Sequence, residues 1–154
     1  METVRIVKGE AMAEQTFEAC EENLNQVLDF VCRQLEIWNC SMKAQTQLEI
    51  AVEELFINIA SYAYPKKADA DKAEQSPKTA KIQIELRPDH IAEITFYDNG
   101  IPYNPLERPD PDVTKPAEER DIGGLGVFLV KKTMDEVKYR YENGQNILTI
   151  RKKM

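Results

Sequence analysis

Three short sets of residues in this chain have the types and spacing that nucleotide chemistry requires. The first lies in residues 54–58, where Glu54 and Asn58 are four positions apart. On a helix this spacing puts both side chains on one face. An amide oxygen and a carboxylate suit Mg²⁺ and its waters, and the carboxylate can accept a proton from an attacking hydroxyl. The alternative is a solvated glutamate beside a locally capping asparagine, and Glu53, five positions from Asn58, is a competing acid that points elsewhere.

The second set is Asp98 and Gly100, in the segment DNGIP that follows an alternating run. An aspartate at a strand end can accept a hydrogen bond from an exocyclic amine. Gly100 has no Cβ, so a flat ring can approach the backbone there. An ordinary Asp-Asn-Gly turn explains the same residues equally well.

The third set is Gly123, Gly124 and Gly126, which open an apolar run at 127–134. Free N–H groups and the positive end of a helix favour phosphate, and glycines let the backbone wrap its oxygens. Neither the P-loop pattern nor the GxGxxG spacing of a dinucleotide site is present. The competing interpretation is a hinge packed under the helix.

Alternating runs and helical periodicity predict the elements that position these sets. Strands are expected at 3–8, more weakly at 15–19, and as two hairpins at 81–86 with 91–98 and at 136–142 with 146–152. Helices are expected from Glu21 to near Trp38, from a cap at Ser41 to a stop by Pro65, and over 127–134. Residues 66–78 read as a solvated loop or a frayed helix. These elements predict an α+β fold in two layers, a mainly antiparallel sheet with helices on one face.

The chain of 154 residues fits one domain, expected to cover 1–154. Residues 99–120 contain five prolines, so no regular structure is expected there. Long loops in compact domains are often functional lids. A lid over 103–122 would lie between the second and third sets of residues.

Composition and charge exclude several classes of protein. The formal charge is −7, and such a surface repels nucleic-acid backbones. No apolar run approaches the roughly 20 residues of a membrane span, so no membrane association is expected. Three cysteines without CxxC spacing, Cys20, Cys32 and Cys40, read as reduced thiols of a cytoplasmic protein. The single histidine, His90, reads as a surface residue in a turn between strands.

Read together and in chain order, the three sets resemble the GHKL ATP-binding fold, which gyrase, Hsp90, histidine kinases and MutL share. The nearest resemblance is to the anti-sigma-factor serine kinases and their stand-alone ATPase-domain relatives. The segments that carry it are EELFINIASYAY, DNGIPYNP, GGLGVFLVKKTMDEVKY and YENGQNILTIRK. The resemblance runs from about Glu21 to the end of the chain. Classical histidine autophosphorylation is not expected, because no histidine-bearing helix pair precedes the fold.

The resemblance implies a role for each matching residue. Asn58 would ligate Mg²⁺, and Glu54 would be the general base or would orient the attacking hydroxyl. Asp98 would hold the adenine amino group of ATP, with Gly100 beneath the ring. The remaining residues would contact the phosphates: Gly123, Gly124 and Gly126 as a cradle, and Arg120 from the lid toward the γ-phosphate.

Two further positions complete this comparison with the family. Tyr62 stands where many members have histidine; tyrosine still forms hydrogen bonds but does not titrate near neutral pH. Lys131 and Lys132 read as surface charges of a helix.

Two functions follow from the resemblance. The first is transfer of the γ-phosphoryl group of Mg-ATP to a serine or threonine of a partner antagonist protein of the anti-sigma type. The alternative is an ATP-gated module that binds a sigma factor or another regulator without transfer. In both, ATP and ADP are ligands and another protein is the partner. Family members are often dimers, so the resemblance also implies that two copies of this chain would form a homodimer.

Overall fold

The computed structural model describes residues 3–7, 10–64, 78–107, 109–110, 112, 114 and 125–154. The strands are β1 (Thr3–Val7), β2 (Glu10–Glu18), β3 (Thr79–Arg87), β4 (Ile91–Asp98), β5 (Glu136–Glu142) and β6 (Gln145–Lys153). The helices are α1 (Leu24–Ile37), α2 (Met42–Asn58) and α4 (Leu125–Thr133). Short turns of other helix types are η1 (Glu21–Asn23), the π-helical η2 (Ile59–Ala63) and η4 (Pro105–Glu107).

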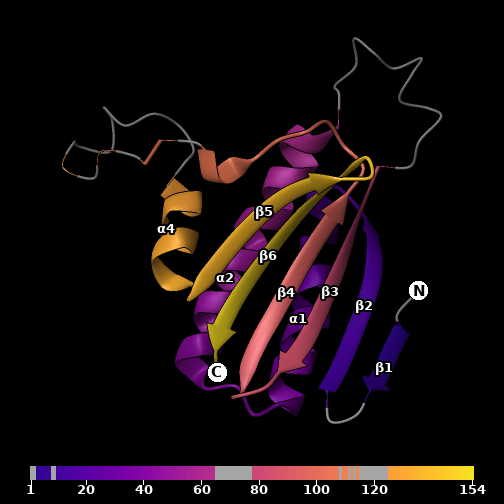
Figure 1. Ribbon diagram of the computed structural model, residues 1–154, viewed down its shortest axis with the longest axis vertical. Helices are drawn as coiled ribbons and strands as arrows, with labels where there is room; N and C mark the ends of the chain where they lie inside the picture. Colours follow the sequence, from indigo (N-terminus) through magenta and orange to yellow (C-terminus); the bar gives the residue numbers. More distant parts are fainter. Residues whose placement is uncertain are drawn as a thin grey trace.

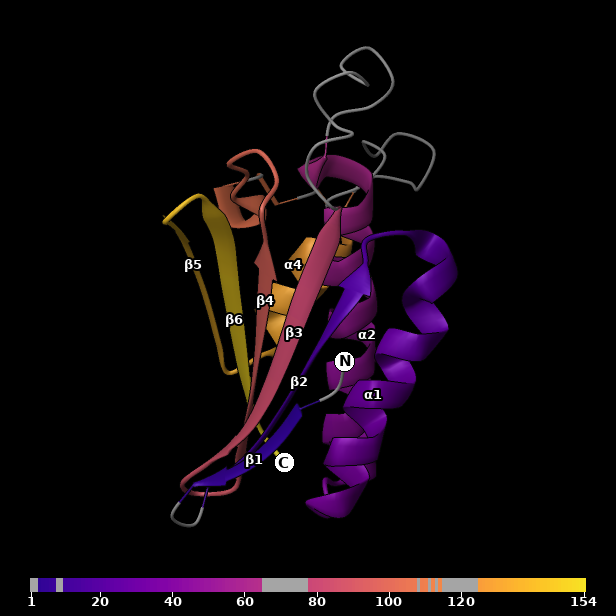
Figure 2. The same ribbon diagram turned by 90° about the vertical axis from the view of Figure 1, so that its right-hand side faces the viewer.

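The strands form one six-stranded sheet in the order β1-β2-β3-β4-β6-β5, and every neighbouring pair is antiparallel. The helices lie together on one face of this sheet (Figures 1 and 2). This arrangement confirms the predicted α+β sandwich. Alternate residues of β3, Ala80, Ile82 and Ile84, are buried toward the helices, as a sheet with one covered face requires.

The strand prediction was too short at β2. Its pattern was evident only over 15–19, whereas the strand begins at Glu10. β2 pairs with β1 on one side and with β3 on the other, from Met12 opposite Glu85 to Glu18 opposite Thr79. Backbone pairing on both edges extends the strand through residues that show little hydrophobic alternation.

The sequence correctly predicted where α2 begins and where the helical segment ends. The Ser41 hydroxyl accepts a hydrogen bond from the Ala44 N–H at 3.2 Å, which confirms the predicted cap. At the other end α2 continues into the π turn η2, and Tyr64, which precedes Pro65, is extended. The helix expected over 127–134 begins earlier, at Leu125, so Gly126 lies in its first turn.

The structure also describes the single histidine and the three cysteines. His90 is exposed in the turn between β3 and β4, as predicted. All three cysteines are free. The Cys32 thiol donates to Glu49 Oε1 at 2.8 Å, and burial together with that carboxylate raises the pKa of the thiol to about 12. None of the described helices has both the length and the apolar character to cross a membrane.

Candidate functional site

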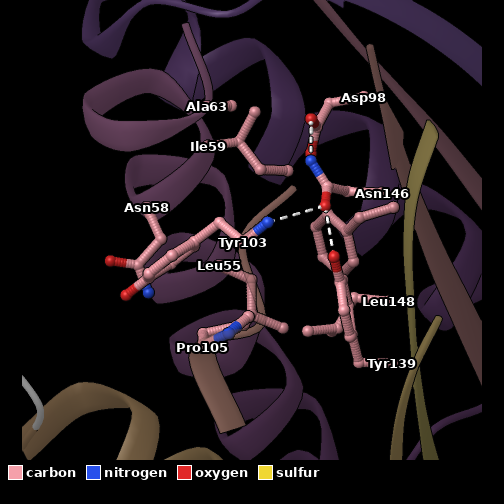
Figure 3. Close-up of a pocket in the computed structure, with 11 residues that line it drawn as sticks. Leu55, Asn58, Ile59, Ala63, Asp98, Tyr103, Pro105, Tyr139, Asn146 and Leu148 are labelled. Atoms are coloured by element: carbon pink, nitrogen blue, oxygen red, sulfur yellow. Dashed lines mark hydrogen bonds between the residues drawn. The ribbon is translucent and has the colours of Figure 1, made fainter. Parts of the chain in front are cut away.

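A pocket opens between the C-terminal end of α2 and the neighbouring ends of β4 and β6 (Figure 3). It encloses about 420 Å³, including space open to solvent. The walls are mostly apolar, with a few polar groups among them, and are formed by Leu55, Asn58, Ile59, Ala63, Phe96, Asp98, Tyr103, Pro105, Tyr139, Asn146 and Leu148.

Asp98, the last residue of β4, is the buried carboxylate of this pocket and only 5% exposed. Its Oδ1 accepts hydrogen bonds from the Gly100 N–H at 2.9 Å and from Asn146 Nδ2 at 2.8 Å. Burial raises the pKa of the carboxyl, and these two donors lower it in part. With Oδ1 already bonded twice, Oδ2 is the oxygen best suited to accept a hydrogen bond from a ligand.

Asn58, the last residue of α2, lines the same pocket on the side opposite Asp98 (Figure 3). Its Nδ2 is buried and has no hydrogen-bond partner among the described residues. A buried polar atom without a partner costs about 1–3 kcal/mol. An amide held at the wall of a pocket with unmet hydrogen-bonding capacity fits a site that is completed by a ligand, and its oxygen suits Mg²⁺.

Glu54 lies one helical turn before Asn58 but contacts α4 rather than the pocket. A Cβ built on Gly126 would lie 1.8 Å from Glu54 Cδ and 2.1 and 2.2 Å from its two carboxylate oxygens. The glycine therefore makes room for this carboxylate against the first turn of α4. The structure thus brings a member of the first set against a member of the third, while Glu53 is exposed.

We expect Gly126→Ala to destabilise the fold by no more than about 1 kcal/mol, because the Glu54 carboxylate, the far end of a flexible side chain, must move away from the added methyl. Urea unfolding measures the change. In a Glu54→Ala background the same substitution should be neutral or stabilising, since alanine exceeds glycine in helix propensity by about 1 kcal/mol. Equal effects of Gly126→Ala in the two backgrounds would contradict the contact.

Gly100 is required for a reason that the sequence did not reveal. A Cβ there would lie 2.1 Å from the Ala63 carbonyl oxygen, and the next N–H, that of Ile101, donates to this same oxygen at 2.8 Å. The space that a side chain would fill is therefore occupied by the end of η2, not left open for a flat ring. A place for Gly100 beneath a base stays a prediction.

Tyr64 ties this end of the α2–η2 segment to two strands. Its hydroxyl donates to the Thr79 carbonyl and accepts from the N–H groups of Thr79, at 3.1 Å, and Asn99, at 3.3 Å. The first contacts anchor the start of β3, and the last anchors the turn that follows Asp98. A single half-buried hydroxyl thus joins the segment bearing Asn58 to the segment bearing Asp98.

Tyr64→Phe is expected to lower the free energy of unfolding by about 1–3 kcal/mol, because the backbone groups at Thr79 and Asn99 lose their shared partner. Urea denaturation measures the loss. Tyr141→Phe, which removes a hydroxyl from an exposed residue of β5, is the matched control. A loss no larger than that of the control would show that the hydroxyl is dispensable.

Several of the predicted residues lie outside the described ranges. These residues are Arg120, Gly123 and Gly124. Most of the 103–122 segment that is expected to form a lid also lies outside these ranges. Of the two helix lysines, Lys131 forms an ion pair with Asp110 and Lys132 lies over the Phe128 ring at 5.5 Å. Within the described ranges, no group of three or more His, Cys, Asp or Glu side chains is arranged to hold a metal ion.

Three pocket residues with hydrogen-bonding side chains were missed from the sequence: Tyr103, Tyr139 and Asn146. Asn146 had a detectable signal, because it shares the inward-facing register of β6 with Leu148 and Ile150 and is polar among apolar residues. Tyr103 falls in the proline-rich segment and carries no pattern. Its ring lies 5.9 Å from that of Tyr62, which is 47% exposed.

Comparisons with known proteins cover most of the chain. A family model described as the histidine kinase-like ATPase domain matches residues 17–152. The serine-protein kinase RsbW of Listeria monocytogenes is 30% identical over 112 residues, which is 70% of this chain and 66% of that relative. RsbW of Listeria innocua is 29% identical over the same shares. RsbW of Bacillus cereus is 30% identical over 105 residues, 66% of this chain, and the chain spans 59% of its length.

Proposed function

Since this chain belongs to the histidine kinase-like ATPase family, we propose that it binds ATP with Mg²⁺ in the pocket between α2 and β4. We further propose that it transfers the γ-phosphoryl group to a serine or threonine of a partner antagonist protein of the anti-sigma type. The transfer is proposed by similarity to relatives named serine-protein kinase.

One observation carries this proposal above the others. Asn58 and Asp98 come from elements far apart in the sequence, yet they line opposite sides of one pocket. Nδ2 of the Asn58 amide is buried and lacks a partner among the described residues, and Oδ1 of Asp98 is already bonded twice, so Oδ2 is the oxygen best suited to a ligand. A nucleotide with an amino group at one end and metal-bound phosphates at the other would use both groups.

In this proposal each residue has a separate task. Asp98 Oδ2 accepts from the exocyclic amino group of adenine. Asn58 would hold Mg²⁺ through its amide oxygen, and the ion would supply positive charge between the phosphate oxygens. The remaining phosphate contacts would come from the glycines of the third set and from the lid, namely Gly123, Gly124, Gly126 and Arg120.

In the transfer step, Glu54 is the proposed general base. The hydroxyl of the partner's serine or threonine forms a bond to the γ-phosphorus while the bond to the β–γ bridging oxygen breaks, so that ADP leaves. The proton released by that hydroxyl passes to the Glu54 carboxylate. The Glu54 side chain already lies against the first turn of α4, at Gly126.

The contact between Glu54 and Gly126 favours a second candidate function, which is nucleotide-dependent binding of a partner without transfer. Because Glu54 lies against Gly126 and is not a lining residue of the pocket, the domain could bind ATP and respond to it without transferring phosphate. It would then hold or release a sigma factor or another regulator according to the nucleotide bound.

The experiment that distinguishes phosphoryl transfer from ATP-gated binding starts with calorimetric titration of the protein with Mg-ATP. Partners are then captured from a lysate of the source organism and incubated with γ-labelled Mg-ATP. Label on a serine or threonine of a small partner, absent when Glu54→Gln replaces the wild type, supports transfer. Binding of ATP and nucleotide-dependent retention of a partner without label supports the second candidate. If ATP does not bind, both are wrong.

A further inference from the structure

Asn146 is a buried polar residue on the apolar side of β6 that the three sequence sets do not include. It is 5% exposed and lies directly opposite Asp98 in the β4–β6 register. A polar side chain at such a position is stable only when its hydrogen-bonding groups are satisfied.

Every hydrogen-bonding position of the Asn146 amide has a protein partner. Nδ2 donates to Asp98 Oδ1 and to the Ile101 carbonyl, both at 2.8 Å. Oδ1 accepts from the Tyr103 N–H at 3.0 Å and from the Tyr139 hydroxyl (Figure 3). An asparagine amide has two N–H donors and one oxygen with two lone pairs, so this set uses its full capacity.

The surrounding donors also determine which way the amide points. A rotated amide would turn its N–H groups toward the Tyr103 N–H, which can only donate, and its oxygen toward the Asp98 and Ile101 oxygens. Both changes exchange hydrogen bonds for repulsion between like groups. Asn146 is therefore held in one orientation and has no group left for a ligand.

The effect of this arrangement falls on the carboxylate opposite. Asn146 and the Gly100 N–H together occupy Oδ1 of Asp98. These two bonds hold the carboxylate at Oδ1 and leave Oδ2 as the oxygen with capacity for a ligand. Through its other two bonds, the same amide holds Ile101 and Tyr103, the chain segment that leaves β4 and forms part of the pocket wall.

We propose that Asn146 is a positioning residue for base selection: it holds Asp98 so that Oδ2 accepts from a purine amino group, and it does not contact the base itself. This inference rests on the proposed nucleotide site. A base with a carbonyl oxygen in place of that amino group would set two acceptors against each other. The site as held by Asn146 therefore selects a 6-aminopurine over a 6-oxopurine.

The test compares two nucleotides that differ at that group, ATP and inosine triphosphate, each titrated with Mg²⁺ into the full chain. Wild-type protein should prefer ATP by at least about tenfold, roughly one charge-assisted hydrogen bond. Asn146→Ala should lower the affinity for ATP about tenfold while the affinity for inosine triphosphate changes less than twofold. Gln145→Ala, on the opposite face of β6, is the matched control and should keep the wild-type preference.

Each other outcome overturns the inference in a recognisable way. An equal loss of both affinities in Asn146→Ala would mean that Asn146 only supports the pocket. An unchanged preference would mean that it does not position Asp98. Failure of the wild type to bind either nucleotide would remove the proposed function as well.

A second variant keeps the test decisive if Asn146→Ala does not fold. Tyr139→Phe removes only the hydroxyl that donates to Asn146 Oδ1. A several-fold smaller preference for ATP is expected, in the same direction as for Asn146→Ala, and an unchanged preference would contradict the inference.

Discussion

Asp98→Asn is expected to weaken ATP binding about 10- to 100-fold, the largest effect on affinity predicted for this chain. Hydrogen bonds to charged groups contribute about 1.5–3 kcal/mol, and each 1.4 kcal/mol is about tenfold in affinity. The asparagine can keep its oxygen toward Gly100 and Asn146, which leaves an N–H donor facing the amino group of the base. Calorimetric titration with Mg-ATP measures the loss.

The same substitution should not destabilise the free protein. Burial raises the pKa of the Asp98 carboxyl above its value in the unfolded chain. The stabilisation linked to that higher pKa is fully present below the unfolded pKa and is lost as the pH rises through the folded one. Asparagine does not titrate, so the melting temperature of Asp98→Asn at neutral pH should equal or exceed that of the wild type, and the difference should shrink in acid.

Asp89→Asn is the matched control, since it makes the same chemical change in the exposed turn between β3 and β4. It should leave the affinity for ATP unchanged. An affinity for ATP that is unchanged in Asp98→Asn would remove Asp98 from the nucleotide site. A large fall in melting temperature would indicate that its role is mainly structural.

Glu54→Gln is expected to abolish phosphoryl transfer while leaving ATP binding within about threefold of the wild type. General base catalysis typically contributes about 10²–10⁴-fold in rate, and glutamine keeps the shape of the side chain against Gly126. Transfer of label from γ-labelled Mg-ATP to the captured partner measures the rate, and calorimetry measures the affinity in parallel.

Glu53→Gln provides a control at the neighbouring position, where the side chain is exposed on the same helix. It should transfer label at the wild-type rate. If Glu54→Gln also does so, Glu54 is not the base. If Glu54→Gln loses ATP affinity and transfer together, Glu54 contributes to binding rather than to the transfer step.

Local sequence patterns predicted most of the fold and the outline of the site. Hydrophobic alternation and helical periodicity depend on side chains close in the sequence, so they identified the hairpins and both long helices. The cap at Ser41 and the end before Pro65 follow from backbone chemistry within a few residues. The full length of β2 required pairing with β3, which lies far away in the sequence.

The features of the candidate site also fall into those that the local sequence predicts and those that depend on tertiary contacts. The sequence by itself determined that Asn58 lies on a helix and Asp98 at a strand end, with residue types suited to the site, because residue types and spacing are local properties. Only the tertiary structure decided that Glu54 lies against Gly126, that Ala63 requires Gly100, and that Asn146 holds Asp98. These contacts join separate elements, and their existence depends on strand register and on how closely helices pack, which no single segment encodes.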